Sequence, residues 1–346
     1  MSENQDWSNL CHDLLRPILE SLSTIDFHRA KTVCSDWYSV WKTCVKRPLC
    51  PWQITHQGNS MKLFDPKEDK IHKIAGLSDF SYYMASYGNW LLMVHSGLDF
   101  YILNLLTCKR INLPSITHRS IVGFERSAVL WINERTEDYF VAFISNQHYL
   151  FSHKKGDDKN MNWNLYDTKV GLFDMAYKNS NLYLYTLDHD IKILDFSGDF
   201  PKVEGMKNPY RVRYFVQPLE YIWKRKIVIP NSGEVLIILS LKKEIHEKKF
   251  LFYIFKMNLE SSQWERVYSI GENEMIIFGH GVTIRAPVQD VGDGIKSDSI
   301  CFVENDLWPD WNRPSSCGIF DLATSTITWP KRFGVHIDQW FIPGSA

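Results

Sequence analysis

Apolar residues follow two different periods along this chain, and the change falls near residue 46. Over residues 10–22, leucines and isoleucines recur at the spacing of one face of an α-helix. A second short helix is predicted to begin after Ser23 or Thr24, and a third after Ser35, because hydroxyl side chains are preferred helix caps. The start of the chain therefore predicts a unit of three short helices.

After residue 50 the pattern changes to short apolar runs separated by polar turns. One unit recurs, in which an apolar strand leads through a turn centred on Asp or Asn into a second strand. It occurs at 61–74, 100–114, 185–196, 252–267 and 318–330. Hairpins that recur every ~40–60 residues are typical of four-stranded blades around an axis. A two-sheet sandwich of unusual size is the alternative, and the repeats are too degenerate to give a blade count.

These patterns predict an α+β multidomain protein with two parts of unequal size. A small all-α unit of three helices is expected over residues 1–46, with a linker and first strand over 47–56. A large all-β domain, a β-propeller by preference, is expected over 57–346. A head of ~45 residues is too small to be robust alone, so much of its apolar face must be covered by a partner or a neighbouring domain.

Composition narrows the choice of partners. The chain has 39 Lys plus Arg and 40 Asp plus Glu, for a formal net charge of -1. This balance argues against nucleic acid or anionic lipid as a bulk partner. No apolar run approaches the ~20 residues of a membrane span, and the N-terminus lacks the features of a signal peptide. The odd count of 7 cysteines favours a reducing compartment, so we expect the cytoplasm, the nucleus or both.

The helical part carries an ordered pattern of residue types. In this sequence it comprises Leu10, Asp13-Leu14-Leu15, Ile18, Leu22, Asp26-Phe27, Arg29, Val33-Cys34 and Trp37. The order, the spacing and the closing Val-Cys-x-x-Trp resemble an F-box. Two departures stand out. Cys11 replaces the usual proline and loses its preset φ, while Pro17 lies inside the first helix, where it removes one hydrogen bond.

The β-rich part resembles the large domain of a plant F-box family that was long known only as a domain of unknown function. The matching segments are Arg47-Pro48, Pro51-Trp52, Gly88–Leu92, Asn104–Thr107, Ile111–Pro114, Asp298–Phe302, Gly318–Leu322 and Trp340–Pro343. The resemblance implies a substrate receptor of an SCF-type ubiquitin ligase. It also implies a Skp adaptor as partner, with cullin and RING subunits beyond it. One branch of the family, named for suppressing a kinked-growth phenotype, acts on shaggy-like kinases in brassinosteroid signalling.

Two sets of contact residues follow. The adaptor is expected to meet Leu10, Asp13, Leu14, Leu15, Ile18, Leu22, Val33, Cys34 and Trp37. Of these, Leu10, Leu14 and Leu15 favour the interface, whereas Ile18, Leu22, Val33 and Trp37 fit internal packing equally well. Propellers bind partners through loops at one end of the channel. The aromatic loop candidates for substrate are Trp163, Trp308, Trp311 and Trp340.

We find no motif for catalysis, cofactor binding or metal binding in the sequence. Asp188-His189-Asp190 brings carboxylates and an imidazole together, but three neighbours on a turn cannot converge on one atom, so we expect a plain exposed turn. Lys224-Arg225-Lys226 is expected to be a solvated strand end, with a phosphate or acidic partner as the alternative. Two other functions stay open, namely a propeller enzyme acting on a small molecule and an F-box scaffold working outside the ligase.

Overall fold

The computed structural model describes most of the chain. The residues described are 10–44, 52–57, 60–65, 69–74, 77, 81–95, 99–116, 124–157, 162–198, 202–203, 208–210, 221–242, 250–271, 273–279, 283–287, 296–303, 317–329 and 336–341. They form a helical head followed by strands in six sheets, the blades of a six-bladed β-propeller. The α+β architecture and the propeller predicted from the sequence are therefore confirmed. None of the described helices is long and apolar enough to cross a membrane.

The head contains helices α1 (His12–Ser21), α2 (Thr24–Ala30) and α3 (Ser35–Thr43). Ser23 caps α2 by accepting a hydrogen bond from the backbone N–H of Asp26, as predicted. The N-cap of α3 is Cys34 rather than Ser35, and that of α1 is Cys11. The boundary that we predicted near residue 46 falls between the end of α3 and the first strand.

The strands of the propeller group by blade. Blade 1 comprises β25 (His336–Phe341), β1 (Trp52–Gln57), β2 (Ser60–Asp65) and β3 (Lys70–Lys73). Blade 2 comprises β4 (Ser81–Tyr87), β5 (Trp90–His95), β6 (Phe100–Asn104) and β7 (Arg110–Asn112). Blade 3 comprises β8 (Phe124–Ile132), β9 (Tyr139–Ser145), β10 (Tyr149–Lys154) and β11 (Asn164–Asp167).

Blade 4 comprises β12 (Leu172–Lys178), β13 (Asn181–Thr186), β14 (Ile191–Asp195) and β15 (Lys202–Val203). Blade 5 comprises β16 (Tyr221–Val228), β17 (Leu236–Lys242), β18 (Phe250–Asn258) and β19 (Gln263–Val267). Blade 6 comprises β20 (Glu274–Phe278), β21 (Thr283–Pro287), β22 (Ser299–Val303), β23 (Cys317–Asp321) and β24 (Thr326–Thr328). In blade 6 the strand β20 pairs antiparallel with β21 and parallel with β22.

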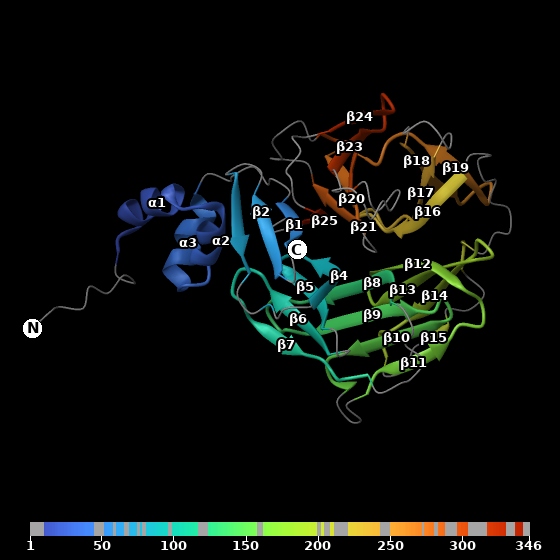
Figure 1. Ribbon diagram of the computed structural model, residues 1–346, viewed down its shortest axis with the longest axis horizontal. Helices are drawn as coiled ribbons and strands as arrows, with labels where there is room; N and C mark the ends of the chain where they lie inside the picture. The colour runs from blue at the N-terminus through green and yellow to red at the C-terminus, as the bar shows by residue number, and fades with distance from the viewer. Residues whose placement is uncertain are drawn as a thin grey trace, which may run out of the picture.

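Figure 1 shows the blades following one another around a common centre, with the head beside β2. The last strand, β25, pairs antiparallel with the first, β1, and so closes the ring. Inner strands pack against one another around the centre, with β8 between β4 and β12, and β12 between β8 and β16. Blade 1 is thus built from one strand of the C-terminal end of the propeller and three strands of its N-terminal end.

All five hairpins predicted from the sequence are present, as β2–β3, β6–β7, β13–β14, β18–β19 and β23–β24. Three of them begin their turn with Asn104, Asn258 or Asp321. Each of these side chains accepts backbone N–H bonds from two and three residues later, at 2.9–3.2 Å. The turn then passes through a left-handed residue with φ between 53° and 58°. The Asn or Asp thus sets the turn locally.

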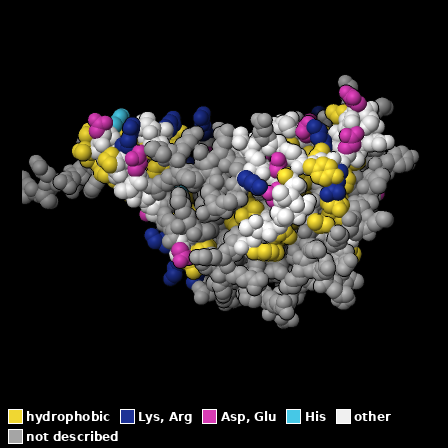
Figure 2. Space-filling model, turned by 90° about the horizontal axis from the view of Figure 1, so that it is seen from above, with side chains coloured by type: hydrophobic (Ala, Val, Ile, Leu, Met, Phe, Trp, Pro, Cys, Tyr) yellow, Lys and Arg dark blue, Asp and Glu magenta, His cyan; other side chains and the backbone are white. Residues whose placement is uncertain are grey.

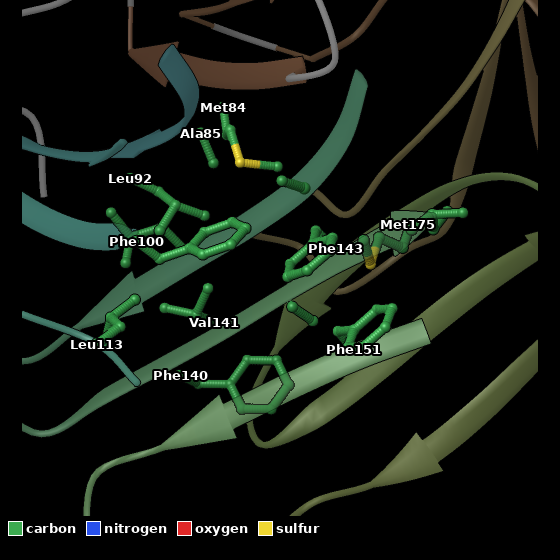
Figure 3. Packing of buried hydrophobic residues seen from close by; sticks show 14 of the residues in the cluster. Met84, Ala85, Leu92, Phe100, Leu113, Phe140, Val141, Phe143, Phe151 and Met175 are labelled. Carbon is green, nitrogen blue, oxygen red and sulfur yellow. The ribbon is translucent and has the colours of Figure 1, made fainter. Parts of the chain in front are cut away.

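Aromatic rings fill the space between neighbouring blades. Phe100 of β6 stacks on Phe143 of β9 with ring centroids 5.0 Å apart, and Phe143 stacks on Phe151 of β10 at the same distance. Figure 3 shows these three rings in one cluster with Met84 of β4 and Met175 of β12. The aromatic richness of the sequence therefore serves packing between blades.

A buried ion pair joins the inner strands of three blades. Lys226 Nζ of β16 lies 3.3 Å from Asp174 Oδ1 of β12, and their side chains are only 6% and 3% exposed. The Ser127 hydroxyl of β8 donates to Asp174 Oδ1 at 2.6 Å, and the Ile227 N–H donates to Oδ2 at 2.9 Å. Our prediction that the basic run ending at Lys226 is a solvated strand end was wrong for this residue, because its ammonium group faces a carboxylate on the next blade.

We predict that Asp174→Ala destabilises the propeller strongly, because it leaves the Lys226 charge buried without its counter-ion. The free energy of unfolding should fall by roughly 3–5 kcal/mol, as for other broken buried pairs. Chemical denaturation would measure it. The matched control is Asp138→Ala, which removes a surface carboxylate 3.5 Å from Lys155 and should change little. Equal losses in the two variants would contradict a structural role for the buried pair.

Candidate docking face on the helical head

The head has a small core of its own. Leu15 and Leu19 of α1 are fully buried against Phe27 and Ala30 of α2 and Val40 of α3. Leu10, Leu22 and Trp37 are half-buried and pack against the edge of this core. The prediction that Leu15 faces a partner was therefore wrong in this conformation, because its side chain is 0% exposed.

Beside this core, other apolar members of the predicted set face solvent. Leu14 and Val33 are each 58% exposed, and the carboxylate of Asp13 is exposed next to Leu14. Ile18 and Cys34 are half-buried. Figure 2 shows hydrophobic side chains at the surface of the head, at the end that points away from the propeller. We call the exposed apolar side chains of the head, Leu14 and Val33, its candidate docking face.

Tyr38 was missed by the sequence analysis. This α3 residue is 41% exposed and stacks on Trp41, with ring centroids 6.1 Å apart and planes inclined by 9°. The ammonium of Lys42 lies 4.2 Å from the centre of the Tyr38 ring. The signal was available, since Tyr38 and Lys42 are four residues apart, the spacing at which helical side chains meet.

The two departures from the F-box pattern leave α1 in place. Cys11 adopts φ -63°, the value that a proline would fix, and its carbonyl accepts bonds from the N–H groups of Leu14 and Leu15. The helix runs through Pro17 and continues to Ser21. The backbone at Cys11 therefore has the geometry that the usual proline imposes.

Of the four tryptophans predicted as substrate contacts, the structure describes two, and both are packed against other residues. Trp340 lies in β25, is 3% exposed and donates its indole N–H to the Phe302 carbonyl at 3.1 Å. Trp163 is half-buried against Phe100 and Phe143, and its indole N–H bonds the Pro114 carbonyl at 2.7 Å. Both rings are packed and both indole N–H groups are bonded, so the prediction that Trp340 lies in a loop was wrong. Trp308 and Trp311 lie outside the described residues.

The Asp188-His189-Asp190 segment forms a turn whose polar groups serve the turn itself. The Thr186 hydroxyl donates to the Asp188 carboxylate, and the Ile191 N–H donates to the Asp190 carboxylate at 2.9 Å. The His189 ring stacks on Phe173 at 5.5 Å. These contacts agree with a turn.

Burial and charge set the electrostatics beside this turn. Burial, together with the nearby Arg225 guanidinium, lowers the pKa of His189. Burial likewise raises the pKa of the Tyr185 hydroxyl, which lies 3.2 Å from His189 Nδ1. The imidazole and the phenol are therefore both held in their neutral forms near neutral pH. Among the residues that the structure describes, no group of three or more His, Cys, Asp or Glu is placed to hold a metal ion.

Comparison with known proteins agrees with both parts of the molecule. The model of the F-box domain matches residues 7–48, and the model of the KIB1-4 beta-propeller matches residues 63–321. A three-helix head joined to a six-bladed propeller thus defines an F-box protein of the β-propeller class. The chain belongs to the family of F-box proteins with a KIB1-4 β-propeller.

Its relatives include three proteins of Arabidopsis thaliana. "F-box only protein 7" is 54% identical over 100% of this chain and 96% of its own length. "F-box/kelch-repeat protein KIB1" is 34% identical over 92% of this chain and 84% of its own, and "F-box protein KIB4" is 32% identical over 85% and 81%. Among solved structures, the β-propeller domain of Cps50 (Swd1) from Myceliophteria thermophila covers 84% of this chain at a TM-score of 0.39 and 12% identity.

We predict that Cys11→Pro stabilises the head, because Cys11 already has a proline-compatible φ and its N–H donates no backbone hydrogen bond within the part of the chain that the structure describes. Restricting the unfolded chain at such a position is worth about 0.4–1 kcal/mol. Calorimetry should therefore show a higher midpoint for the unfolding of the head. Tyr38→Pro is the control in α3, because the Tyr38 N–H donates to the Cys34 carbonyl at 3.0 Å and a proline would remove that bond. Its midpoint should fall, and a gain there like that of Cys11→Pro would argue against the backbone argument at Cys11.

Proposed function

We propose that this chain is the substrate-recognition subunit of an SCF-type ubiquitin ligase. The head binds a Skp adaptor, and through it cullin and RING subunits, while the propeller recruits a protein for ubiquitination. The observation that carries the proposal is the exposure of Leu14 and Val33, each at 58%, on a head that matches the F-box model. In this assignment the chain itself performs no catalytic step.

The physical argument rests on the size and composition of the docking face. Two large apolar side chains that a head of three short helices leaves more than half exposed are candidate anchors for a partner. Burying a leucine or a valine fully is worth about 1.5–3 kcal/mol, so a few anchors supply most of a stable interface. The half-buried Ile18, Leu22 and Trp37 would extend the contact beyond Leu14 and Val33.

For the propeller, we propose a protein partner held by loops at one end of the channel. The formal net charge of the chain is -1, and the Lys226 ammonium is paired with the buried Asp174 carboxylate. Both features support a protein partner rather than a polyanion. Shaggy-like kinases of brassinosteroid signalling are the first substrate class to test, on the strength of the family resemblance alone. We propose that the complex works in the cytoplasm, the nucleus or both, which the odd count of 7 cysteines supports.

We predict that Leu14→Asp or Val33→Asp abolishes capture of a Skp adaptor by the full chain. A charge at either position would have to be desolvated at an apolar interface. Both side chains face solvent, so the head should keep its fold, as circular dichroism would show. Affinity capture with purified adaptor measures the effect.

The matched control is Leu259→Asp, which places the same charge on a propeller leucine that is 62% exposed. Its adaptor capture should equal that of the wild type. Leu15→Asp is unsuitable as a test, because Leu15 is buried in the head core and its loss would unfold the head. Failure of the wild type to capture the adaptor, or full capture by Leu14→Asp and Val33→Asp, would overturn the proposed function.

A further inference from the structure

Helix α2 divides its side chains between the head and the propeller. Phe27 and Ala30 belong to the core of the head. Ile25, on the same helix, is 8% exposed and lies in a cluster with Trp52 of β1 and Leu103 of β6. One short helix therefore contributes to the cores of two domains.

A hydrogen bond between the head and the propeller accompanies the apolar contact of Ile25. Arg29 Nε of α2 donates a part-buried hydrogen bond of 2.9 Å to the Leu106 carbonyl in the β6–β7 turn. Leu106 itself is only 4% exposed. This bond ties α2 directly to blade 2, and a charged donor makes it stronger than a bond between neutral groups.

The turn that presents the Leu106 carbonyl is held on its own side. Asn104 Oδ1 accepts bonds from the N–H groups of Leu106 and Thr107 at 3.0 and 2.9 Å. The Leu105 N–H donates to the Asn89 carbonyl of the adjacent turn at 2.9 Å. The N–H groups of residues 105–107 are thus held by bonds within blade 2, independently of the contact with the head.

Arg29 also forms a surface ion pair within the head. Its Nη1 nitrogen lies 3.6 Å from Asp26 Oδ1, with the two side chains 44% and 56% exposed. Asp26 Oδ2 accepts a hydrogen bond from the hydroxyl of Ser23, the residue that caps α2. A continuous series of polar contacts therefore runs from the cap of α2 through Asp26 and Arg29 to the propeller turn.

We propose that α2 and the β6–β7 turn form a rigid joint, with Arg29 as its positioning residue, that holds the docking face of the head at a fixed orientation to the propeller. Domains joined by a short connection usually move relative to each other unless their interface is well packed. The Ile25 contact and the Arg29 bond together oppose such motion. Under the proposed function, on which this use of the joint rests, a fixed orientation decides which lysines of a recruited protein reach the ubiquitin-bearing subunits.

The test is a distance measurement on the full chain without any partner. Spin labels are attached through noncanonical amino acids at two exposed positions, Ser39 of α3 and Arg135 of the β8–β9 turn. Pulsed electron resonance then gives the distribution of head-to-propeller distances. The wild type should give one narrow distribution, and Arg29→Ala should broaden it about twofold as the domains gain relative motion.

Arg16→Ala is the matched control. Arg16 is also an arginine of the head, but its side chain bonds Thr43 within the head at 3.0 Å, so the distribution should stay narrow. Asn104→Ala is a second variant that loosens the turn without touching the head, and it should broaden the distribution as Arg29→Ala does. Narrow distributions in both the Arg29 and Asn104 variants, or equal broadening by Arg16→Ala, would overturn the joint.

This outcome is separable from that of the proposed function. Arg29→Ala should still capture the Skp adaptor, because Leu14 and Val33 are unchanged. A chain that never captures the adaptor but shows the broadening keeps the joint and loses the ligase assignment. A chain that captures the adaptor with no broadening keeps the ligase assignment and loses the joint.

Discussion

The antiparallel pairing of β1 with β25 is the contact on which the rest of the molecule depends. Trp52 opens β1 and pairs in register with Phe341 at the end of β25, and both side chains are 1% exposed. Their cluster contains Ile25 of the head. Because β1 is the first strand after α3, the head is seated where the ring closes. This pairing joins the two ends of the propeller, so its formation must overcome the conformational entropy of the long chain segment between them. Only then does the apolar cluster form against which Ile25 of the head packs.

The features of this fold that depend on neighbouring residues could be predicted from the sequence. Those that depend on contacts between distant segments could not. The five hairpins were predictable because a residue such as Asn104 sets its turn through bonds to N–H groups only two and three residues away. The parallel pairing of β20 with β22 had no such local signal. Trp340 was placed in a loop for the same reason, since only the distant strand β1 makes its segment a strand.

The same division applies to the candidate docking face. Periodicity identified the apolar stripe of α1 but could not separate Leu14, which faces solvent, from its neighbour Leu15, which α2 and α3 cover. The two side chains point about 100° apart on a helix, and only the packing of the other helices decides which is buried. Lys226 was misjudged likewise, because Asp174 lies on another blade and the basic run alone suggested solvent.

The central claim is that the head binds an adaptor through Leu14 and Val33, while helix α2 of the head packs against the propeller. Hydrogen exchange of the full chain, with and without a purified Skp adaptor, tests this most directly. The account predicts new protection in α1 and around Val33, with unchanged exchange in the β6–β7 turn beneath Arg29. Protection confined to the propeller blades, with the amides of α1 unaffected, would contradict it.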